Sequence, residues 1–374
     1  MSLSHSQDSS NSAFLTAETD FGLNMMRQAP ATEPLVVSPI SVIFALGMIQ
    51  LGAKGKTKTQ INQLISKESS DIDIINYYSN LSSQIQNATN GVSTRIANGF
   101  FLNKQFAISD QYRGDIAKKY AALIQSVDFT NQQQAAETIN TFVNETTAGK
   151  IEEIVKAEEL KDPFSIIVNA IYFNAEWEIK FDSDRNSLGT FHSTPEKGRE
   201  ITFMNDFGVY RLYTEDQDVQ VLSLSYKDTS YAFNIFLPKQ KYNLATIREN
   251  FKGETIQKYL SQLDTTKVSI TIPKIKIETN FKLKEALVAM GATEMFTKNA
   301  DLSGIVKAPP LYVSKAAHKA IIEVDEAGTT AAAATMMEIM AGSGMGEPKS
   351  FVADHPFMFV LTKDRNPLFI GQFV

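Results

Sequence analysis

Apolar and polar residues in the first part of the chain follow a helical period. Apolar side chains recur from Phe14 to Met25 and from Ile40 to Met48 at spacings of three and four, so we expect a helix over each range. Ser38-Pro39 supplies the second helix with a capping side chain and a proline in its first turn. Weaker patterns predict further helices near 56–65, 71–87, 109–122 and 132–146.

From Phe164 onward the pattern changes to runs of strand-forming residues: SIIVNAIYF, VQVLSLSY, YAFNIFLP, KVSITIPKIKIE, LYVSKAAHKAIIEV and FMFVLTKDRNPLFIGQFV. The four residues 364–367, Asp-Arg-Asn-Pro, predict a turn, so the C-terminus should be a hairpin. One more helix is expected at 282–290, closed by Gly291.

These patterns predict one α+β domain over residues 1–374, with a flexible polar start at 1–12. No internal repeat and no long polar linker divides the chain, and 43% of its residues are hydrophobic, enough for a large core. A helical N-terminal domain followed by a separate β domain is the alternative.

Charge and cysteine content narrow the function classes. The formal net charge is -6, which favours neither nucleic acid nor an anionic membrane as a partner. The chain has no cysteine, so disulfides, thiolate catalysis and cysteine-ligated zinc are absent. The start lacks the basic and then apolar segments of a classical signal peptide, and no apolar run reaches a membrane-spanning length. We expect a cytoplasmic protein or one exported by another route, and secretion stays open.

The sequence offers no constellation for catalysis. His318 lies in a strand-like run and is best interpreted as a buried structural histidine. Gly342-Ser343-Gly344 lacks both the spacing and the following helix of a nucleophile elbow, and no metal, phosphate or dinucleotide motif occurs. We therefore expect no catalytic residue, no cofactor and no metal, with a hydrolase using Ser343 as the rival hypothesis.

The segment from Glu326 to Thr335, EAGTTAAAAT, consists almost wholly of small residues. Alanine permits a helix, but the segment has no apolar stripe that would pack one. Small side chains instead allow a strand to enter between two existing strands without steric clash. Gly328 can serve as the hinge that such a movement needs.

At this point the chain resembles the serpins, a family of protease inhibitors, over about residues 14–374. The resemblance rests on the hinge from Glu326 to Thr335 and on several further motifs: SPIS at 38–41, INTFVNETTAGKI at 139–151, NAIYF at 169–173, ADLSGI at 300–305, LYVSK at 311–315 and ADHPF at 353–357. Val37, Phe142 and Ala175 depart from the residues most common in the family, and the chain ends at Val374 without a tail.

The resemblance implies a serpin fold of three β-sheets with about eight to nine helices and an exposed reactive-centre loop at 327–350. It implies inhibition as a suicide substrate: a protease cleaves the loop and forms an acyl-enzyme, and the loop then inserts into the central sheet and distorts the protease. On this basis we assign a shutter (Ser38, Ser41, Asn169, His318), a breach residue (Trp177) and a hinge (Glu326, Gly328, Thr329, Thr330, Ala331, Ala332, Ala333, Ala334, Thr335).

The family spacing leaves the scissile bond open. Counting about sixteen residues beyond Glu326 reaches Gly342, whereas counting back from Pro356 reaches Met345, and Met340 is also credible. The reactive-bond candidates are Met340, Ala341, Gly342, Ser343, Met345 and Gly346.

The partner expected from the loop is a protease with an apolar pocket. No Lys or Arg occurs from Gly328 to Pro348, so we expect a chymotrypsin-, elastase- or cathepsin-G-like target rather than a trypsin-like one. A papain-like cysteine protease and, because of Glu338, an acid-preferring granzyme-type protease remain alternatives, as does a non-inhibitory carrier or chaperone. The predicted helix at 71–87 has no basic residue, so we expect no strong heparin site, and we expect a monomer.

Overall fold

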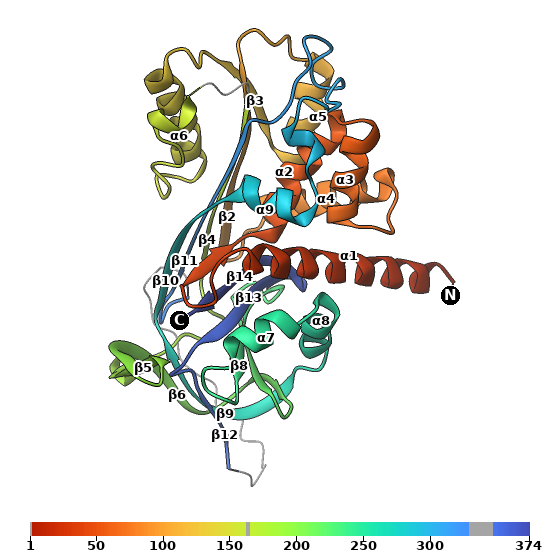
Figure 1. The fold of residues 1–374 in the computed structure, drawn as a ribbon. Helices are drawn as coiled ribbons and strands as arrows, with labels where there is room; N and C mark the ends of the chain where they lie inside the picture. The colour runs from red at the N-terminus through yellow and green to blue at the C-terminus, as the bar shows by residue number, and fades with distance from the viewer. Residues whose placement is uncertain (1, 162–164, 329–346) are drawn as a thin grey trace.

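The computed structural model describes residues 2–161, 165–328 and 347–374, with side chains from Asn11 onward. These residues form nine α-helices and two hydrogen-bonded β-sheets (Figure 1), so the α+β class and the expected number of helices are confirmed. Figure 1 shows α1 projecting to one side of the molecule, with α2 and α6 on opposite faces of the upper half of one sheet.

The helices are α1 (Ser2–Arg27), α2 (Pro39–Gly52), α3 (Gly55–Ile65), α4 (Asp71–Gln86), α5 (Asp110–Tyr120), α6 (Gln132–Thr146), α7 (Leu244–Asn250), α8 (Gly253–Ser261) and α9 (Leu283–Met290). Both predicted caps are present, because the Ser41 N–H donates to the Ser38 side chain and Gly291 ends α9 in a left-handed conformation. Residues 2–12, where we expected a flexible start, continue α1 as helix, since each residue added to an existing helix gains a backbone hydrogen bond.

The sheet that matters for the site has five strands in the order β10-β11-β4-β2-β3. Their bounds are β2 (Val92–Asn103), β3 (Leu123–Val127), β4 (Ser165–Ala175), β10 (Ile275–Phe281) and β11 (Lys315–Val324). β11 and β4 run parallel at the centre, and each is antiparallel to its outer neighbour. Since β4 is covered on one face by α2 and on the other by α6, its side chains are buried almost continuously.

The second sheet has nine strands: β1 (Leu35–Val37), β5 (Ser187–Thr194), β6 (Lys197–Glu215), β7 (Val219–Ser225), β8 (Tyr231–Pro238), β9 (Asp264–Pro273), β12 (Lys349–Val352), β13 (Phe357–Lys363) and β14 (Asn366–Phe373). The long strand β6 pairs with β5, β7 and β9, so strands that the resemblance places in two sheets form one hydrogen-bonded network here.

The sequence pattern predicted some strands and missed others. The C-terminal hairpin is present, but its turn is made by Asp364 and Arg365 alone, at φ 47° and 67°, and Pro367 already pairs with Thr362 within the hairpin. The run KVSITIPKIKIE is divided near Pro273 into β9 and β10. Strands β1, β2 and β3 lie in the part that we interpreted as helical, because β2 is buried on both faces over most of its length and lacks the alternation of a half-buried strand.

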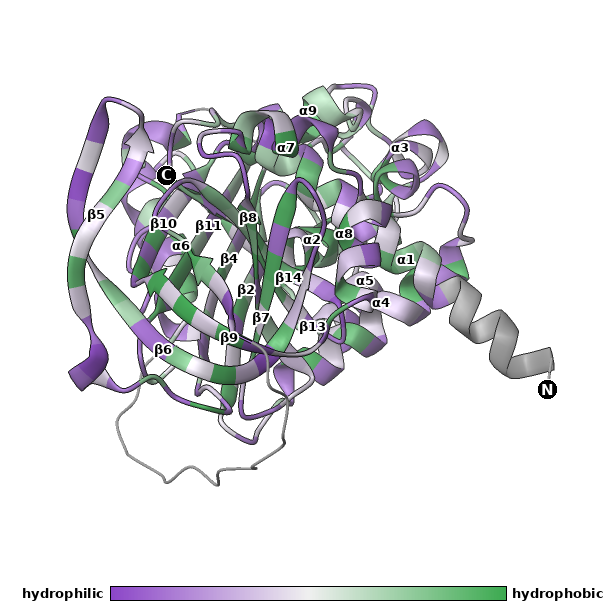
Figure 2. Cartoon of the chain, turned by 90° about the horizontal axis from the view of Figure 1, so that it is seen from below, coloured by the Kyte–Doolittle hydropathy of each residue, from purple (hydrophilic) through white to green (hydrophobic). Residues whose placement is uncertain are grey.

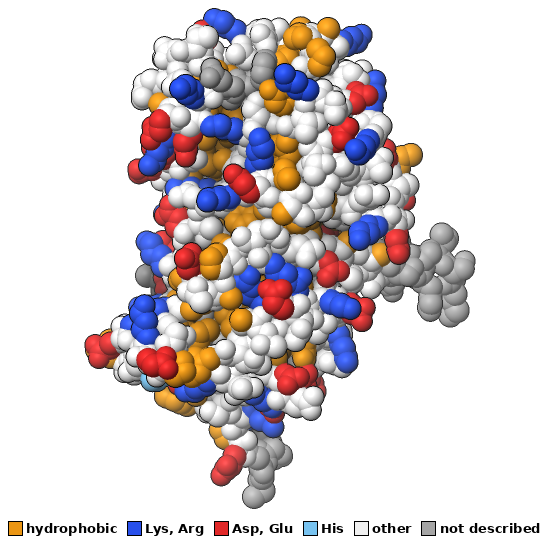
Figure 3. All heavy atoms as spheres, in the orientation of Figure 1, with side chains coloured by type: hydrophobic (Ala, Val, Ile, Leu, Met, Phe, Trp, Pro, Cys, Tyr) orange, Lys and Arg blue, Asp and Glu red, His pale blue; other side chains and the backbone are white. Residues whose placement is uncertain are grey.

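The core lies in two layers on either side of the five-stranded sheet. The larger layer fills the space between this sheet, the helices around α2 and the second sheet, and the smaller one lies under α6. Figure 2 shows hydrophobic segments concentrated on the central strands, and Figure 3 shows Lys and Arg interspersed with Asp and Glu on the visible face. None of the helices within the described ranges is long and apolar enough to cross a membrane.

Candidate functional site

The parallel pair β11–β4 forms a seam through the middle of the five-stranded sheet. Its register places Lys315 opposite Ile166 and His318 opposite Asn169. Both strands run toward the same end of the sheet, where β4 leads into Trp177 and β11 into the turn at 325–328. The residues predicted as shutter and breach therefore lie along one seam, the first group at its middle and the second at its end.

A row of buried polar side chains crosses the seam at its middle. Asn98 on β2 pairs in register with Asn169 on β4, and Asn169 pairs with His318 on β11. The Asn169 amide donates to Asn98 Oδ1, and Asn169 Oδ1 lies 2.6 Å from His318 Nδ1. All three residues are at most 1% exposed, so each hydrogen bond replaces water that these groups lost on folding.

The start of α2, which covers one face of the sheet, supplies the remaining hydrogen bonds of this network. The Ser38 N–H donates to His318 Nε2 over 3.0 Å, and Ser41 Oγ donates to Asn169 Oδ1 over 2.8 Å. Ser38 Oγ donates to the carbonyl of Leu368 on β14 over 2.6 Å, which ties the network to the second sheet. Because Ser38 is the cap that starts α2, one residue sets both the helix position and the hydrogen bonds under the seam.

His318 is held in one neutral tautomer. Its Nε2 accepts from the Ser38 backbone N–H, so its proton is on Nδ1, which donates to Asn169. Burial lowers the pKa of His318 from 6.5 to about 3, and the hydrogen bond to Asn169 only partly opposes this. The imidazole is thus uncharged at neutral pH, and with 1% of His318 exposed it is unsuited to act as a general base on a substrate.

At the end of the seam, Trp177 packs against the turn that follows β11. The indole N–H donates to the carbonyl of Asp325 over 2.8 Å, and the Trp177 backbone N–H donates to the carbonyl of Ala327 over 3.0 Å. The indole ring stacks on Tyr226 with ring centroids 4.4 Å apart. Trp177 is 2% exposed and is fixed by hydrogen bonds as well as by packing, so it is more than a core aromatic residue.

Gly328 occupies a position that admits no side chain. Its φ is +122°, and a Cβ there would lie 2.3 Å from the Ala175 carbonyl oxygen and 2.6 Å from the Trp177 nitrogen. Gly328 forms antiparallel bridges to Asp325 and to Glu176. The chain after β11 therefore turns back on itself and meets the end of β4 at this glycine.

Glu326 is anchored by two residues that the sequence did not reveal. Lys274 forms an ion pair with its carboxylate at 2.6 Å, and the Asn186 amide donates to the same carboxylate. Burial favours a higher pKa for Glu326, but these two hydrogen bonds, together with a backbone hydrogen bond and the charge of Lys274, lower the pKa. Lys274 lies between β9 and β10, far from Glu326 in sequence, so only the folded chain brings them together. Asn98 was missed for the same reason.

The other predicted residues lie outside the described ranges: Thr329, Thr330, Ala331 to Ala334, Thr335, and the bond candidates Met340, Ala341, Gly342, Ser343, Met345 and Gly346. Of the predicted site, the structure brings Ser38, Ser41, Asn169 and His318 into one network, and it places Trp177, Glu326 and Gly328 in one turn. Asn98, Lys274 and Asn186 are additional members.

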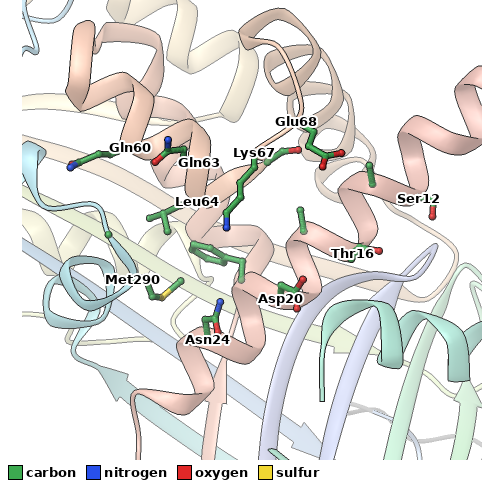
Figure 4. A pocket seen from close by; sticks show the side chains of 15 residues that line it. Ser12, Thr16, Asp20, Asn24, Gln60, Gln63, Leu64, Lys67, Glu68 and Met290 are labelled. Atoms are coloured by element: carbon green, nitrogen blue, oxygen red, sulfur yellow. The ribbon is translucent and has the colours of Figure 1, made fainter. Parts of the chain in front are cut away.

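A polar groove of about 750 Å³ lies elsewhere, between α1, α3 and the end of α9 (Figure 4). Two of its polar groups are engaged within the protein: Asp20 accepts from the Gly253 N–H over 2.6 Å, and Gln60 accepts from the Glu294 N–H over 2.8 Å. None of the sequence-predicted site residues lines this groove. We assign no function to it.

Known proteins resemble this chain in sequence and in fold. The family described as serpin (serine protease inhibitor) matches residues 16–374. Serine protease inhibitor 42Dd of Drosophila melanogaster is 32% identical over 354 residues, covering 94% of this chain and 93% of that protein. Serpin48 of Tenebrio molitor, a highly specific serpin, superposes with a TM-score of 0.86 at 27% identity over 96% of this chain and 97% of its own. Human thyroxine-binding globulin shares the fold, with a TM-score of 0.87 at 24% identity over 96% and 97% of the two chains.

Proposed function

The chain belongs to the serpin family, and on this premise we propose that it inhibits a serine protease by trapping it as an acyl-enzyme. In this proposal the protease cleaves within 340–346, and the segment after Gly328 then enters the seam between β11 and β4 as a new strand. The protease remains attached by its ester and is carried to the far end of the sheet, where its distorted active site cannot complete hydrolysis.

The observation that carries this proposal is the register set at Gly328. Gly328 is bridged antiparallel to Asp325 on the β11 side and to Glu176 on the β4 side. In an antiparallel ladder each step forward on one strand matches one step back on the other. Extending both ladders brings Thr335 opposite His318 on one side and opposite Asn169 on the other. His318 and Asn169 are already paired across the seam, so both extensions agree and a single strand fits without a register shift.

The same register separates the residues that would form the inserted strand from the candidates for the cleaved bond. Extending it further pairs Glu338 with Lys315 and Ile339 with Ser165, which are the first residues of β11 and β4. Residues from Met340 onward then have no strand beside them. A protease bound through an ester must stay outside the sheet, so cleavage after Met340, Gly342 or Met345 fits the proposal. Cleavage after Glu338 does not, which weighs against an acid-preferring target.

Insertion is favourable for a physical reason. A strand of this length forms on the order of ten backbone hydrogen bonds, each contributing about 1 kcal/mol. The polar row at Asn169 must open first, because His318 and Asn169 join β11 and β4 at the point where these strands separate. The Asn98 and Ser41 partners of Asn169 do not lie on β11, so Asn169 keeps these bonds while the seam opens. The closed state is then held kinetically.

The proposed class of target protease follows from the residues around the candidate cleaved bonds. Methionine suits an apolar specificity pocket, and the absence of Lys and Arg from Gly328 to Pro348 weighs against a pocket that carries a carboxylate. We therefore propose a chymotrypsin-, elastase- or cathepsin-G-like target. A carrier without inhibitory activity is the second candidate, because thyroxine-binding globulin has the same fold, but the small residues from Thr329 to Ala334 favour an inserting strand.

Incubation of the protein with chymotrypsin tests the proposal. We expect a complex that survives SDS, together with a released C-terminal peptide whose mass identifies the cleaved bond. Ser343→Ala should leave complex formation largely intact, whereas it would abolish a hydrolase that depends on Ser343. If chymotrypsin, elastase and cathepsin G all yield only cleaved protein and free protease at every stoichiometry, trapping is wrong.

A further inference from the structure

A cavity of about 770 Å³ lies beside the upper end of the seam, between β11, α9 and the segment that leads from α6 to β4. It exists because β10 is shorter than β11 at this end: β10 stops at Phe281, which pairs with His318, so residues 315–317 of β11 have no partner on β10. Residues of helix α9 and of the segment 154–159 line this cavity beside the unpaired residues of β11. The volume lies within the range of about 300–1,000 Å³ that is typical of small-molecule sites.

The walls of this cavity are mostly apolar, unlike those of the groove in Figure 4. The apolar lining consists of Ile154, Val155, Ile166, Phe281, Val288, Ala316 and Ala317. Val155, Ile166 and Phe281 are less than 9% exposed and belong to the core, whereas Val288 on α9 is 38% exposed and lies at the margin. Such walls accommodate an aliphatic or aromatic body without leaving a polar group unpaired.

The polar residues of the lining carry more positive than negative charge. Lys284 donates to the carbonyl of Ser314 over 2.7 Å, whereas Lys282 and Lys315 have no hydrogen bond or ion pair within the described residues. Of the two carboxylates, Glu159 accepts from the Lys156 N–H over 2.8 Å, and Glu285 has no partner in the described part of the chain. Two unpaired ammonium groups against one unpaired carboxylate favour an anionic ligand.

We propose that this cavity binds a small amphipathic anion, with its apolar body against Phe281 and Ile166 and its carboxylate or sulfonate near Lys282 and Lys315. A medium-chain fatty acid anion has this chemistry. The ligand would contact both sides of the seam, because Ile166 belongs to β4 whereas Lys315 to His318 belong to β11. Binding therefore favours the closed seam over the separated strands.

The consequence for regulation rests on the proposed function. If insertion requires β11 and β4 to part, a ligand that bridges them slows insertion. The protease then completes hydrolysis of the loop more often before it is trapped, so the protein acts more as a substrate of the protease and less as its inhibitor. The ligand can do this only to the extent that it binds the closed seam more tightly than the opened one.

Titration calorimetry with decanoate, and with decanol as the neutral analogue, tests the site on the full-length protein. We expect decanoate to bind, decanol to bind at least tenfold more weakly, and the double variant Lys282→Gln/Lys315→Gln to lose about tenfold in decanoate affinity. Lys298→Gln is the matched control, because Lys298 is exposed and does not line the cavity. The proposal fails if wild type does not bind decanoate, if decanol binds equally well, or if both lysine variants behave alike.

A second pair of variants tests the location without touching the lysines. Val288→Asp places a negative charge at the margin of the cavity and should weaken decanoate binding about tenfold, whereas Ile72→Asp, at an exposed apolar position on α4, should not. Equal affinities of these two variants would place the ligand elsewhere and overturn the site.

The regulatory consequence has its own readout. In the proposed function, cleavage of the loop by a non-target protease lets the loop insert and should raise the melting temperature, because the new strand adds backbone hydrogen bonds. We expect saturating decanoate to slow that rise several-fold. If decanoate binds and the rise occurs at an unchanged rate, the coupling is wrong although the site stands. If the rise never occurs with or without decanoate, the proposed function fails and the calorimetric result still decides the site.

Discussion

The middle of the seam and its end are built in different ways. At the middle, Asn98, Asn169 and His318 join three strands through side-chain hydrogen bonds. At the end, Gly328 and Trp177 are held by close backbone packing and by bonds to main-chain carbonyls. Side-chain hydrogen bonds can be exchanged one partner at a time, whereas a backbone contact that excludes even a Cβ fixes the chain path. We therefore expect the strands to separate at the middle of the seam, and we expect the end of the seam to fix where the entering segment starts.

We expect the largest effect from a substitution that blocks insertion of the proposed strand directly after Gly328. In the inserted state that we propose, Thr329 would face the side of Val324 and Ala175, both buried, and Thr330 would face the side of Glu323 and Asn174, both partly exposed. Thr329→Arg would force a charge into the core layer, so we expect complete loss of the SDS-stable complex.

Thr330→Arg is the matched control, with the same new side chain one residue later. We expect it to retain most complex formation, measured as the stoichiometry of inhibition of chymotrypsin. Equal stoichiometries for the two variants would mean that the strand enters in another register or does not enter at all.

The next largest effect tests the middle of the seam. Asn169→Ala removes the buried hydrogen bonds that Asn169 makes with His318 Nδ1, Ser41 Oγ and Asn98 Oδ1, which should lower the free energy of unfolding by about 3–5 kcal/mol. Asn98→Ala removes one of these bonds and should cost about 1–2 kcal/mol. Urea unfolding measures both, and a smaller loss for Asn169→Ala than for Asn98→Ala would contradict a network centred on Asn169.

At the end of the seam, Gly328→Ala should cost about 2–3 kcal/mol, because the new Cβ meets three main-chain atoms within 3 Å. Trp177 is the one tryptophan of the chain, so its fluorescence reports this turn directly, and we expect its emission to shift to longer wavelength as the turn moves.

Gly291→Ala provides the control, since Gly291 has a similar φ of +113° and a Cβ at this position would meet nothing within 4 Å. We expect about 1 kcal/mol of destabilisation there and no change in emission. An unchanged emission for Gly328→Ala as well would show that the end of the seam is less tightly built than its middle.

The smallest effect is a pH dependence located at the middle. Burial lowers the pKa of His318 to about 3 in the folded protein, whereas the unfolded chain titrates near 6.5. The unfolded state therefore binds more protons between these values, so stability is fully present above pH 6.5 and is lost as the pH falls toward 3. At pH 5 the loss from this residue should be about 2 kcal/mol. His318→Gln should show a shallower dependence between pH 6.5 and 5, and parallel curves would exclude this role.

Particular residues show how far sequence reasoning reaches. Helix α2 was predictable because Ser38 and Pro39 act within one turn, and α9 because Gly291 follows it directly. Strand β2 was not, since its burial on both faces comes from α6 and α2, which the local pattern does not contain. The role of Asn98 on β2 could not be predicted either, because an asparagine in a strand indicates no function until the neighbouring strand is known.

The amino-acid sequence alone identified the family and singled out Ser38, Ser41, Asn169, Trp177, His318 and Gly328, because each belongs to a local pattern or motif, and it predicts the small-residue hinge. The folded chain was needed to show that His318 is neutral, that Lys274 and Asn186 hold Glu326, and that Gly328 bridges both Asp325 and Glu176. The physical reason is that burial, ion pairs and strand pairing depend on distances between segments far apart in the chain, and a sequence specifies those distances only once it has folded.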